Sequence, residues 1–547
     1  MAVGSGNGKQ WLSEPHLGQM GYTKVRFVVA MACACALVYI LSFAVMSARP
    51  CWNTCIPTSC SPVGSPLASN SLSQPAASVE ESDMVPKRLH DQVFHPQKQS
   101  ESALMAVGEP EQLALNTRAE THRRGTDISR IVFGIAAAAD VWKGRKEYIK
   151  LWWKPEMRGF VWLDKTPDGE EWDDRYPPFK VSEKTTNFEY TNKKGWRFAI
   201  RISRIVSETF RLGLPDVDWF VLGDDDTLFF SENLVQVLSK YDHRKMYYIG
   251  SNSESHLQNI LFSYNMAFGG GGFAISHPAA KILSKMQDSC LARYPHLFGS
   301  DDRMHACMAE LGVPLTKEPG FHQFDIHGDA SGILASHPVV PLVSIHHLDL
   351  IDPIFPNTKD KNYTRVGALK HLLEASTLES ASTMQQSICY DKSRRWSFTV
   401  SWGYVVQVYK GFITPRELEV PQKTFLSWHK ETSKVEFPFN TRSNPDDVCK
   451  RPTRFFMESV KGPTESGSKN SMTGYFVREF SEEKMACSEK LQPLNGVQRI
   501  KVVRELTDSS WYQIPRRSCC RVKRWKNEDI DIHVGGCKDG ETLISSY

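Results

Sequence analysis

One long apolar segment, Phe27 to Ala48, constrains what this chain can fold into more than any other feature of its sequence. It carries no charge and matches the roughly 20 residues that an α-helix needs to cross the hydrocarbon core of a bilayer. Basic residues precede it, whereas none occurs between Arg49 and Lys87, and this asymmetry places the N-terminus in the cytosol. The alternative, a cleaved signal peptide, has a shorter apolar region of about 7–15 residues nearer the N-terminus. We predict a cytosolic tail over residues 1–26 and a transmembrane signal anchor over residues 27–48, with the remainder lumenal.

Composition separates a stem from folded domains. Within residues 49–125, the part from about Ser61 to Thr121 is rich in Ser, Pro, Ala, Glu and Gln and poor in aromatic residues, so its apolar surface is too small to offset the entropy lost on ordering. We predict a flexible lumenal stem there. The chain of 547 residues is 41% hydrophobic and 23% charged, which is enough for at least two folded units. Its net charge of +4 is small and its Lys and Arg residues are scattered, which argues against nucleic acid as a partner.

The cysteines outside the apolar segment all lie on the predicted lumenal side. Because that compartment is oxidising, disulfide bonds are their expected state. The adjacent Cys519 and Cys520 are expected to join different partners, although their spacing does not give the connectivity. One sequon, Asn362-Tyr363-Thr364, would be glycosylated if it is exposed.

From Ile128 onward, short apolar runs alternate with amphipathic stretches, as in the strands and helices of an α/β domain. The period of the apolar residues distinguishes the two types of element. The expected elements are a strand at Ile131–Ile135, a helix at Lys146–Trp153, a strand at Phe160–Leu163, a helix at Trp196–Leu212 and a strand at Trp219–Leu222. We predict one α/β domain over residues 126–366.

The C-terminal part of the chain has the alternation of β structure. From Trp396 to Val408 every second residue is apolar, which in a single extended strand would place seven side chains on one face. Ile530, Ile532 and Val534 repeat the pattern more weakly. We predict a mainly β, disulfide-containing domain of unknown role over residues 367–547.

Three aspartates follow the strand predicted at Trp219–Leu222. Carboxylates at the C-terminal edge of a buried strand in an α/β sheet lie where ligands bind. Asp224 and Asp226 would point to the same side of an extended segment, and Mg²⁺ or Mn²⁺ prefers such oxygen ligands together with phosphate oxygens. The alternative is a solvated acidic turn, which the apolar strand before the cluster and Phe229-Phe230 after it make less favourable.

Two further motifs carry possible chemistry. The glycine run Gly269–Gly272 would let the backbone approach a ligand or a neighbouring strand, or it forms a bulge or turn. Asp301 and Asp302 open an amphipathic helix, where acidic residues favour the helix dipole and Ser300 can act as a cap. A second acidic cluster apart from a metal would also supply the general base of an inverting transferase.

Histidines occur in two apolar contexts late in the α/β region. His322 lies in GFHQFD, and His346-His347 lie in VSIHHLD. An imidazole there is a candidate metal ligand, although a lone histidine is more often structural.

The order of these motifs resembles a known family. VFGIAAAADVWKGRKEYIKLWW, DWFVLGDDDTLFF, FGGGGFAIS, SDDRMHACMAELG and GFHQFD follow one another as in the fringe branch of glycosyltransferase family 31. The chain is more similar still to the plant group of fringe-related proteins that is catalogued by a domain of unknown function. The resemblance covers about residues 131–352, and it extends to the C-terminal region only in that plant group.

The resemblance implies a GT-A fold, a type II Golgi anchor, a UDP-sugar donor, Mn²⁺ (or Mg²⁺) and inversion to a β-linkage. Asp224, Asp225 and Asp226 fall on the family's DxD motif, with Asp226 as the first metal candidate. Asp302 falls on the acidic pair that supplies the base, with Asp301 as its neighbour.

Other family positions carry over less directly. His322 and His346 each match a histidine position of related enzymes and are expected to be metal ligands. Arg145 and Ala137, in or near the loop from Ile135 to Asp140, would lie near the nucleotide, as would Gly270 and Gly271. The loop reads AAAAD, without the hydroxyl and basic residues common in animal fringe, so the donor sugar is left open.

We therefore predict an inverting, metal-dependent hexosyltransferase of the Golgi membrane. It would move a hexose or N-acetylhexosamine from a UDP-sugar to a glycan or glycoconjugate, and the resemblance to fringe implies a β-1,3 linkage. One alternative is a non-catalytic lumenal glycan-binding protein that keeps the fold. Another is a lumenal metal-dependent phosphohydrolase, which the absence of a second set of closely spaced ligands in the sequence disfavours.

Overall fold

The computed structural model describes residues 125–169, 172–356, 361–428, 436–467, 469–480, 487, 494, 496–526 and 529–545. All of them belong to one compact unit, residues 109–547. Among these described residues, no helix is long and apolar enough to span a bilayer. The predicted cytosolic tail, the anchor at residues 27–48 and all but the last residue of the stem lie outside the described residues.

The α/β half opens with the expected strand, helix and strand. β1 (Ile131–Ala136) is buried along its whole length, α3 (Ala139–Trp152) follows, and β2 (Arg158–Leu163) runs parallel to β1. The helix forms because Trp142, Tyr148, Ile149 and Trp152 recur at helical spacing and are buried. The predicted β-α-β order is thus confirmed.

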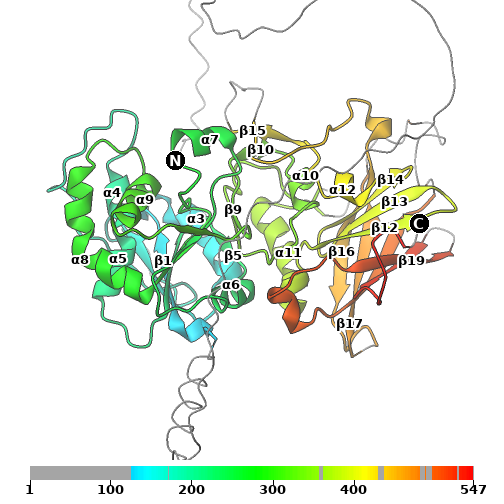
Figure 1. Ribbon diagram of the computed structural model, residues 1–547, viewed down its shortest axis with the longest axis horizontal. Helices are drawn as coiled ribbons and strands as arrows, with labels where there is room; N and C mark the ends of the chain where they lie inside the picture. Colours follow the sequence, from blue (N-terminus) through cyan, green and yellow to red (C-terminus); the bar gives the residue numbers. More distant parts are fainter. Residues whose placement is uncertain are drawn as a thin grey trace, which may run out of the picture. The chain divides into compact units, whose positions relative to one another are not determined.

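A seven-stranded mixed sheet forms the centre of this half (Figure 1). Its order is β3-β2-β1-β4-β7-β6-β8, and β1 lies between two parallel neighbours, β2 and β4. Its other strands are β3 (Phe179–Val181), β4 (Trp219–Asp224), β6 (Tyr248–Gly250), β7 (Phe273–Ser276) and β8 (Leu315–Lys317). The acidic motif therefore begins at the carboxyl end of a central strand.

Two layers of helices cover the sheet, and a separate apolar cluster fills each face. Figure 1 shows α4, α5, α8 and α9 together on one side. The helices of the α/β half after α3 are α4 (Phe198–Ser203), α5 (Ile205–Arg211), α6 (Ser231–Leu238), α7 (His256–Leu261), α8 (His277–Arg293), α9 (Ser300–Glu310) and α10 (Ser331–Leu334). Short 3₁₀ turns are η2 (Ile128–Arg130), η3 (Ser380–Ser382), η4 (Val448–Lys450) and η5 (Ser509–Tyr512).

The single helix predicted at Trp196–Leu212 is wrong in one respect, because the structure divides it into α4 and α5 at Arg204. The Ser203 hydroxyl donates to the carbonyl of Ile200, at 2.9 Å, which competes with regular helical hydrogen bonding. Arg204 is buried and its guanidinium pairs with Glu208 at 3.0 Å and Asp288 at 2.9 Å. Its ion pairs fix the break.

Two small sheets complete the α/β half. β5 (Leu228–Phe229), β11 (Ser344–His346) and β9 (Phe321–Gln323) form one of them. β10 (Ile326–Gly328) pairs antiparallel with β15 (Phe425–Ser427), a strand from the C-terminal half. This pairing ties the two halves together.

The C-terminal half is a closed eight-stranded barrel, which confirms its mainly β character. Its strand order is β12-β13-β14-β16-β17-β18-β20-β19. Helix α11 (Arg365–Leu378) contacts both α3 and β16 and lies between the two halves in Figure 1, and α12 (Pro415–Leu418) follows β14. The barrel strands are β12 (Gln386–Asp391), β13 (Trp396–Ser401), β14 (Val405–Lys410), β16 (Thr453–Lys461), β17 (Ser471–Arg478), β18 (Arg499–Glu505), β19 (Cys519–Lys526) and β20 (Asp529–Gly535).

The alternating segment at Trp396–Val408 is a hairpin, so the prediction of one extended strand is wrong. The chain turns between β13 and β14, where Gly403 has a φ of +76° that favours glycine. Phe398 pairs with Val408 and Val400 with Val406, so the alternation is retained across the hairpin. The register of this hairpin keeps the apolar side chains of both strands on the same face of the sheet. An alternation of apolar residues therefore does not reveal that the chain reverses its direction.

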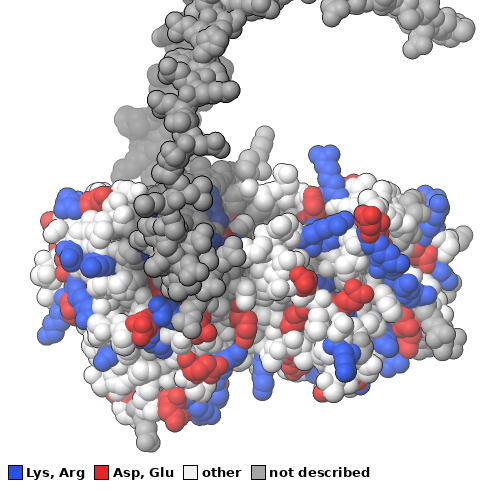
Figure 2. All heavy atoms as spheres, turned by 60° about the horizontal axis from the view of Figure 1, so that its bottom comes forward, with Lys and Arg blue, Asp and Glu red and all other residues white. Residues whose placement is uncertain are grey.

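Four disulfides join the described cysteines, and three of them are in the barrel half. Cys519 and Cys520 have different partners, as predicted. The pairs are Cys290–Cys307, Cys389–Cys520, Cys449–Cys487 and Cys519–Cys537. Figure 2 shows cationic and anionic side chains interspersed on the face it displays.

Candidate active site

The acidic motif forms a tight turn at the carboxyl end of β4. The Thr227 backbone N–H donates to the Asp224 carbonyl at 3.0 Å, and the Asp224 backbone N–H donates to the Thr227 hydroxyl at 2.8 Å. The same hydroxyl donates to the Gly270 carbonyl at 2.7 Å. The Asp225 backbone N–H donates to the Ala136 carbonyl of β1 at 3.0 Å. The turn is therefore fixed to the neighbouring strand and to the glycine loop.

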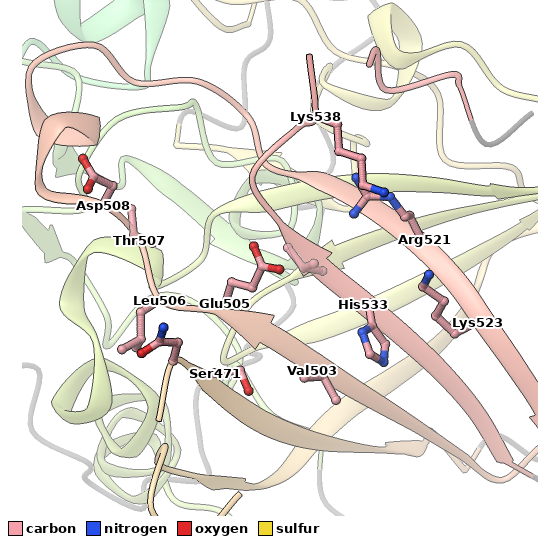
Figure 3. Close-up of a pocket in the computed structure, with 12 residues that line it drawn as sticks. Ser471, Val503, Glu505, Leu506, Thr507, Asp508, Arg521, Lys523, His533 and Lys538 are labelled. Carbon is pink, nitrogen blue, oxygen red and sulfur yellow. The ribbon is translucent and has the colours of Figure 1, made fainter. Parts of the chain in front are cut away.

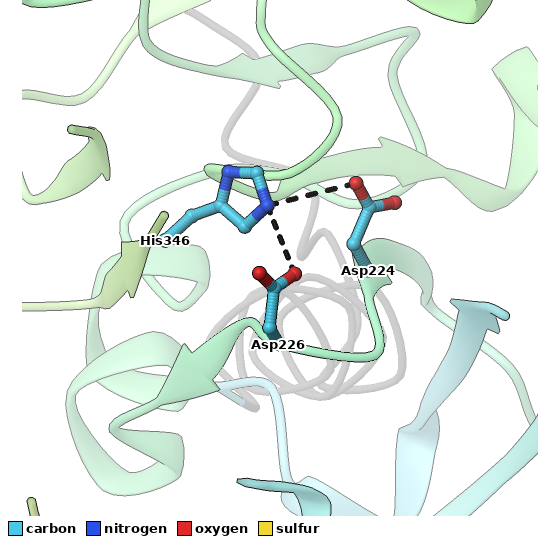
Figure 4. A group of neighbouring side chains, drawn as sticks. All are labelled: Asp224, Asp226 and His346. Carbon is cyan, nitrogen blue, oxygen red and sulfur yellow. Dashed lines mark ion pairs between the residues drawn. The ribbon is translucent and has the colours of Figure 1, made fainter. Parts of the chain in front are cut away.

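Asp224, Asp226 and His346 converge, as Figure 4 shows. One ligand atom from each residue lies within 4.8 Å of the others. His346 Nε2 is 3.0 Å from Asp226 Oδ1 and 3.7 Å from Asp224 Oδ2. Two carboxylates and an imidazole are donors that suit a divalent cation such as Mn²⁺ or Zn²⁺, and oxygen donors also suit Mg²⁺. These three residues therefore fit a metal site.

The tautomer of His346 also suits metal binding. His346 Nδ1 lies 3.0 Å from the Gln323 side-chain oxygen, which can only accept a hydrogen bond. Nδ1 therefore carries the proton, and the lone pair of Nε2 faces the two carboxylates. This contact orients the ring in the way that outer partners orient histidine ligands.

Arg145 on α3 is placed beside the same cluster. Its guanidinium forms ion pairs with Asp226 and, at 3.0 Å, with Asp349. The Tyr148 hydroxyl donates to Asp349, which holds that carboxylate in place. The predicted nucleotide-binding arginine thus contacts the candidate metal ligand directly.

The three aspartates have different pKa values because their surroundings differ. Burial and the neighbouring Asp226 and Asp301 carboxylates raise the pKa of Asp224 well above its usual range. Burial and Asp226 raise the pKa of Asp225 to about 7. Burial opposes ionisation of Asp226 too, but the positive charge of His346, when its ring is protonated on both nitrogens, and that of Arg145 outweigh burial and lower the pKa of this carboxyl. The cluster carries more potential negative charge than its own cations neutralise, which a bound cation would correct.

The glycine loop lies against the imidazole of His346. A Cβ at Gly270 would be 2.0 Å from His346 Cε1, and one at Gly271 would be 3.2 Å from the backbone nitrogen of Gln323. Gly272 has a φ of +86°. The positions of Gly270 and Gly272 therefore favour glycine strongly, and that of Gly271 leaves little room for a side chain, because the backbone packs directly on the side of the candidate metal site.

Ala137 follows β1 at the same edge of the sheet. Its carbonyl accepts a hydrogen bond from Arg201 Nη2 at 2.8 Å, and Arg201 Nη1 donates to the Trp162 carbonyl at 3.0 Å. Burial lowers the pKa of Arg201, and Asp164 and other carboxylates oppose that change. Sequence reasoning missed this buried guanidinium because it lies within an otherwise amphipathic helix.

Asp301 and Asp302 open α9 but have different contacts. Both Asp302 oxygens accept backbone hydrogen bonds, from Phe298 at 2.8 Å and Gly299 at 2.9 Å, so this residue caps the helix. Asp301 accepts from the Gly269 backbone and from Ser300, and its charge acts on Asp224. Burial raises the pKa of Asp301 to about 7. Of the two, Asp301 is the one directed to the glycine loop.

The structure does not bring His322 into the cluster. Its Nδ1 is 2.8 Å from Glu254, and its Nε2 is 3.0 Å from His337 Nε2. Burial lowers the pKa of His322 to about 4 and raises that of Glu254 well above its usual range. Among the predicted histidines, His346 is therefore the one grouped with the aspartates.

Around His346, sequence reasoning named His347 as a candidate ligand but did not identify Gln323 and Asp325. His347 has a φ of +62°, a conformation that costs a residue other than glycine about 1–3 kcal/mol. Its Nδ1 lies 2.8 Å from Asp325, and Gln323 Nε2 donates to the same carboxylate at 3.2 Å. Gln323 and Asp325 follow His322 in GFHQFD. From the sequence, this motif was selected for His322, whereas Gln323 and Asp325 are the residues of the motif that lie near His346.

A separate cavity of about 760 Å³ lies on the barrel (Figure 3). Its side chains come from β17, β18, β19 and β20 and from the segments just before β17, after β18 and after β20. Charged groups of both signs line it, including Glu505, Lys523 and Lys538. Its lining contains no Phe, Tyr or Trp and shares no residue with the aspartate cluster.

Two family models match the chain. Residues 181–328 match a family described as Fringe-like, and residues 258–520 match a family described as a protein of unknown function, DUF604. The first match contains Asp224, Asp226 and the Asp301-Asp302 pair, whereas His346 lies in the second.

Two curated relatives are similar over a short region. A beta-1,3-glucosyltransferase of Mus musculus is 35% identical over 107 residues, which are 20% of this chain and 21% of the relative. A beta-1,3-glucosyltransferase of Homo sapiens is 33% identical over 105 residues, which are 19% of this chain and 20% of the relative. The chain spans about a fifth of the length of these relatives.

Proposed function

We propose that this chain, which is a fringe-related protein, is a glycosyltransferase that moves a hexose or N-acetylhexosamine from a UDP-sugar to a glycan or glycoconjugate. The observation that carries the proposal is the convergence of Asp224, Asp226 and His346 at the carboxyl edge of a mixed α/β sheet. Ligands of open α/β sheets bind at this edge. The sheet and its acidic edge support a GT-A type of domain.

The donor set supports a divalent metal, with Mn²⁺ as our first choice. Asp224, Asp226 and His346 Nε2 would hold the ion, which when bound would neutralise the diphosphate and the charge developing on the leaving UDP. Gln323 keeps the proton on His346 Nδ1, and Arg145 limits the repulsion between the carboxylates. Both residues prepare the site before the donor binds.

Asp301 is our proposed general base. Its raised pKa, about 7, matches the requirement that a base accept a proton near neutral pH, whereas the Asp302 oxygens are occupied by two backbone donors. In the proposed step, Asp301 takes the acceptor hydroxyl proton while that oxygen bonds to the anomeric carbon. The bond from the anomeric carbon to the phosphate oxygen breaks, and its electron pair leaves with UDP. A single displacement of this kind inverts the anomeric centre.

The donor and the linkage follow from the relatives only as proposals. Both matched relatives are named beta-1,3-glucosyltransferases, so UDP-glucose and a β-1,3 linkage are the first choices. UDP-galactose and UDP-N-acetylglucosamine are the comparison donors. The acceptor is proposed as a glycan or glycoconjugate without further specification.

We propose a type II Golgi membrane location. The uncharged segment at residues 27–48 supports the anchor, and four disulfides among the described residues support an oxidising lumenal compartment. Asn362 of the sequon is exposed, so it is accessible for lumenal glycosylation. Fractionation and glycosidase digestion of the expressed chain would test both points.

The decisive experiment is UDP binding and UDP release by the purified full chain. We expect calorimetry to show binding of UDP or one UDP-sugar with Mn²⁺ but not with EDTA, and we expect Asp226→Ala to lose it. UDP release without an acceptor should have the same metal requirement. A folded chain that binds no UDP-sugar would contradict the proposal and favour a non-catalytic glycan-binding protein, for which the barrel cavity is the first candidate site.

A further inference from the structure

The C-terminal half reaches the candidate active site through the segment that contains β15. Gln422 and Arg442 form a bridge at the base of this segment, and β15 pairs with β10 of the α/β half. On the far side, the His256 backbone N–H at the start of α7 donates to the Glu436 carbonyl at 3.2 Å. The segment is therefore attached to the α/β half at several points.

Trp428, which directly follows β15, stacks on two histidines of the α/β half, one of which is adjacent to His346. Its ring centroid is 4.7 Å from that of His347, and the two planes differ by 9°. It is also 5.2 Å from the ring of His327, with an angle of 7°. The His347 ring in turn lies 4.0 Å from the ring of His346. A single imidazole thus separates a tryptophan of the C-terminal half from a candidate metal ligand.

Hydrogen bonds complete a path between the same residues. His347 Nδ1 is 2.8 Å from Asp325, and Gln323 links that carboxylate to His346 Nδ1. The left-handed backbone of His347 requires its surroundings to hold it, because this conformation is unfavourable for residues other than glycine. Stacking by Trp428 on one side and the Asp325 contact on the other supply that restraint.

We propose that Trp428 is a positioning residue of the candidate metal site. By stacking on His347, Trp428 keeps the His347 ring in contact with Asp325 and keeps Asp325 in contact with Gln323. Because Gln323 contacts His346 Nδ1, these contacts fix the direction in which His346 Nε2 points. The proposal rests on the proposed function, because it assumes that Asp224, Asp226 and His346 bind a metal. It gives the C-terminal half a part in the chemistry of the α/β half.

The test measures Mn²⁺ affinity by calorimetry on the full chain in the presence of UDP. Loss of a partner outside the ligand set typically weakens a metal site by about 10–100-fold, so we expect at least about tenfold weaker binding in Trp428→Leu. Trp428→Phe keeps an aromatic ring on His347 and should recover most of the affinity. Trp511→Leu is the matched control, since Trp511 is a partly buried tryptophan of the C-terminal half outside this stack.

A double-mutant cycle separates positioning from general damage. If Trp428 acts through His347, the loss in His347→Ala and the loss in Trp428→Leu should not add in the double variant. Excess Mn²⁺ should restore turnover in Trp428→Leu. Thermal unfolding of every variant checks that the fold is intact.

Each negative result has a distinct meaning. Wild-type Mn²⁺ affinity in folded Trp428→Leu, with binding lost in Asp226→Ala, would overturn the positioning role and leave the proposed function standing. If Trp428→Leu does not fold, wild-type affinity in His347→Ala would overturn it, because the path passes through that residue. Absence of Mn²⁺ binding by the wild-type chain would overturn both.

Discussion

In the α/β half, carboxylates converge at the end of one strand, whereas in the barrel half each of two partly or fully buried guanidinium groups lies beside carboxylates of opposite charge. Asp224 and Asp225 have raised pKa values because burial and the nearby Asp226 carboxylate oppose ionisation. Arg454 instead pairs with Glu479, and Arg504 lies 3.9 Å from Glu379. Uncompensated charge is costly in a folded protein, so its concentration at one place indicates chemistry.

The two halves also differ in how they are held together. The barrel closes its own sheet edges and contains three of the four disulfides among the described residues, whereas the α/β half leaves the carboxyl edge of its sheet to the loops that carry the cluster. The difference suggests a division of labour: the α/β half supplies reacting groups and the barrel supplies stability. The β15 segment is the exception, and five predictions test this division of labour.

The largest effect is expected from Asp226→Asn. This change keeps the shape of the side chain but removes the charge that His346 and Arg145 contact. Loss of such electrostatic stabilisation costs about 10²–10³-fold in turnover, and we expect at least that loss together with loss of Mn²⁺ binding. Steady-state kinetics and calorimetry provide the measurement.

Asp531→Asn on β20 is the control for that variant. Asp531 is a carboxylate of the barrel half outside the candidate site, so both turnover and Mn²⁺ affinity should stay near wild type. Equal losses in the two variants would break the comparison, since the chemistry would then depend on carboxylates in both halves.

The next largest effect separates Asp301 from Asp302. A general base typically contributes about 10²–10⁴-fold, so Asp301→Asn should reduce turnover by at least about a hundredfold. Asp302→Ala should instead lower stability by about 1 kcal/mol, because two backbone donors at the start of α9 lose their acceptor. If Asp302→Ala abolishes turnover in a stable protein while Asp301→Asn does not, the roles are reversed.

The pH dependence of stability gives an independent check on Asp301. Its pKa is raised from 3.8 to about 7 in the folded state, so the folded protein binds the proton more tightly than the unfolded chain. The contribution to stability is full below pH 3.8 and is lost as the pH rises to about 7. The amide of Asp301→Asn does not ionise, so this variant does not lose stability as the pH rises. In EDTA at pH 8 its melting temperature should therefore exceed that of the wild type. A lower melting temperature there would contradict the assignment.

The first strand, helix and strand of the α/β half could be predicted from the sequence because the spacing of their own apolar residues determines them. Ile131–Ile135 and Phe160–Leu163 were recognisable as fully apolar runs, and the helix between them by its spaced tryptophans. The break at Arg204 was missed because its ion pairs do not change the spacing of the apolar residues. The hairpin turn at Gly403 was missed because the register keeps the apolar side chains on one face of the sheet.

The candidate site could be predicted only in part for a similar reason. Asp224 and Asp226 follow a strand, so their place at the sheet edge followed from local sequence. The choice of His346 over His322 depended on the pairing of β11 with β5 and β9, which spacing does not give. Trp428 lies in a different half of the chain, and its contact with His347 required the β10–β15 pairing.

A smaller effect, on stability alone, is expected from Arg454→Ala. Arg454 on β16 pairs with Glu479 and, at 3.1 Å, with Asp329 of the α/β half, and it donates to the Ser331 hydroxyl at 3.0 Å. Removing one partner leaves partly buried carboxylates without compensation and should cost about 2–3 kcal/mol of unfolding free energy. Turnover per folded molecule should be unchanged, and denaturant unfolding together with kinetics tests both statements. A large loss of turnover at wild-type stability would show that the barrel does more than stabilise.

The smallest effect compares one disulfide from each half. Cys389–Cys520 closes a loop of 131 residues and Cys290–Cys307 one of 17, and loop-closure entropy grows with the logarithm of length. Removing the barrel disulfide with paired alanines should therefore cost at most about 2 kcal/mol more than removing the other. Denaturant midpoints of the two double variants measure the difference. Because Cys307 lies on α9, which also carries Asp301, the second variant is also the one in which turnover can change. An equal loss of turnover in both would mean that the barrel and the site are coupled more widely than through Trp428.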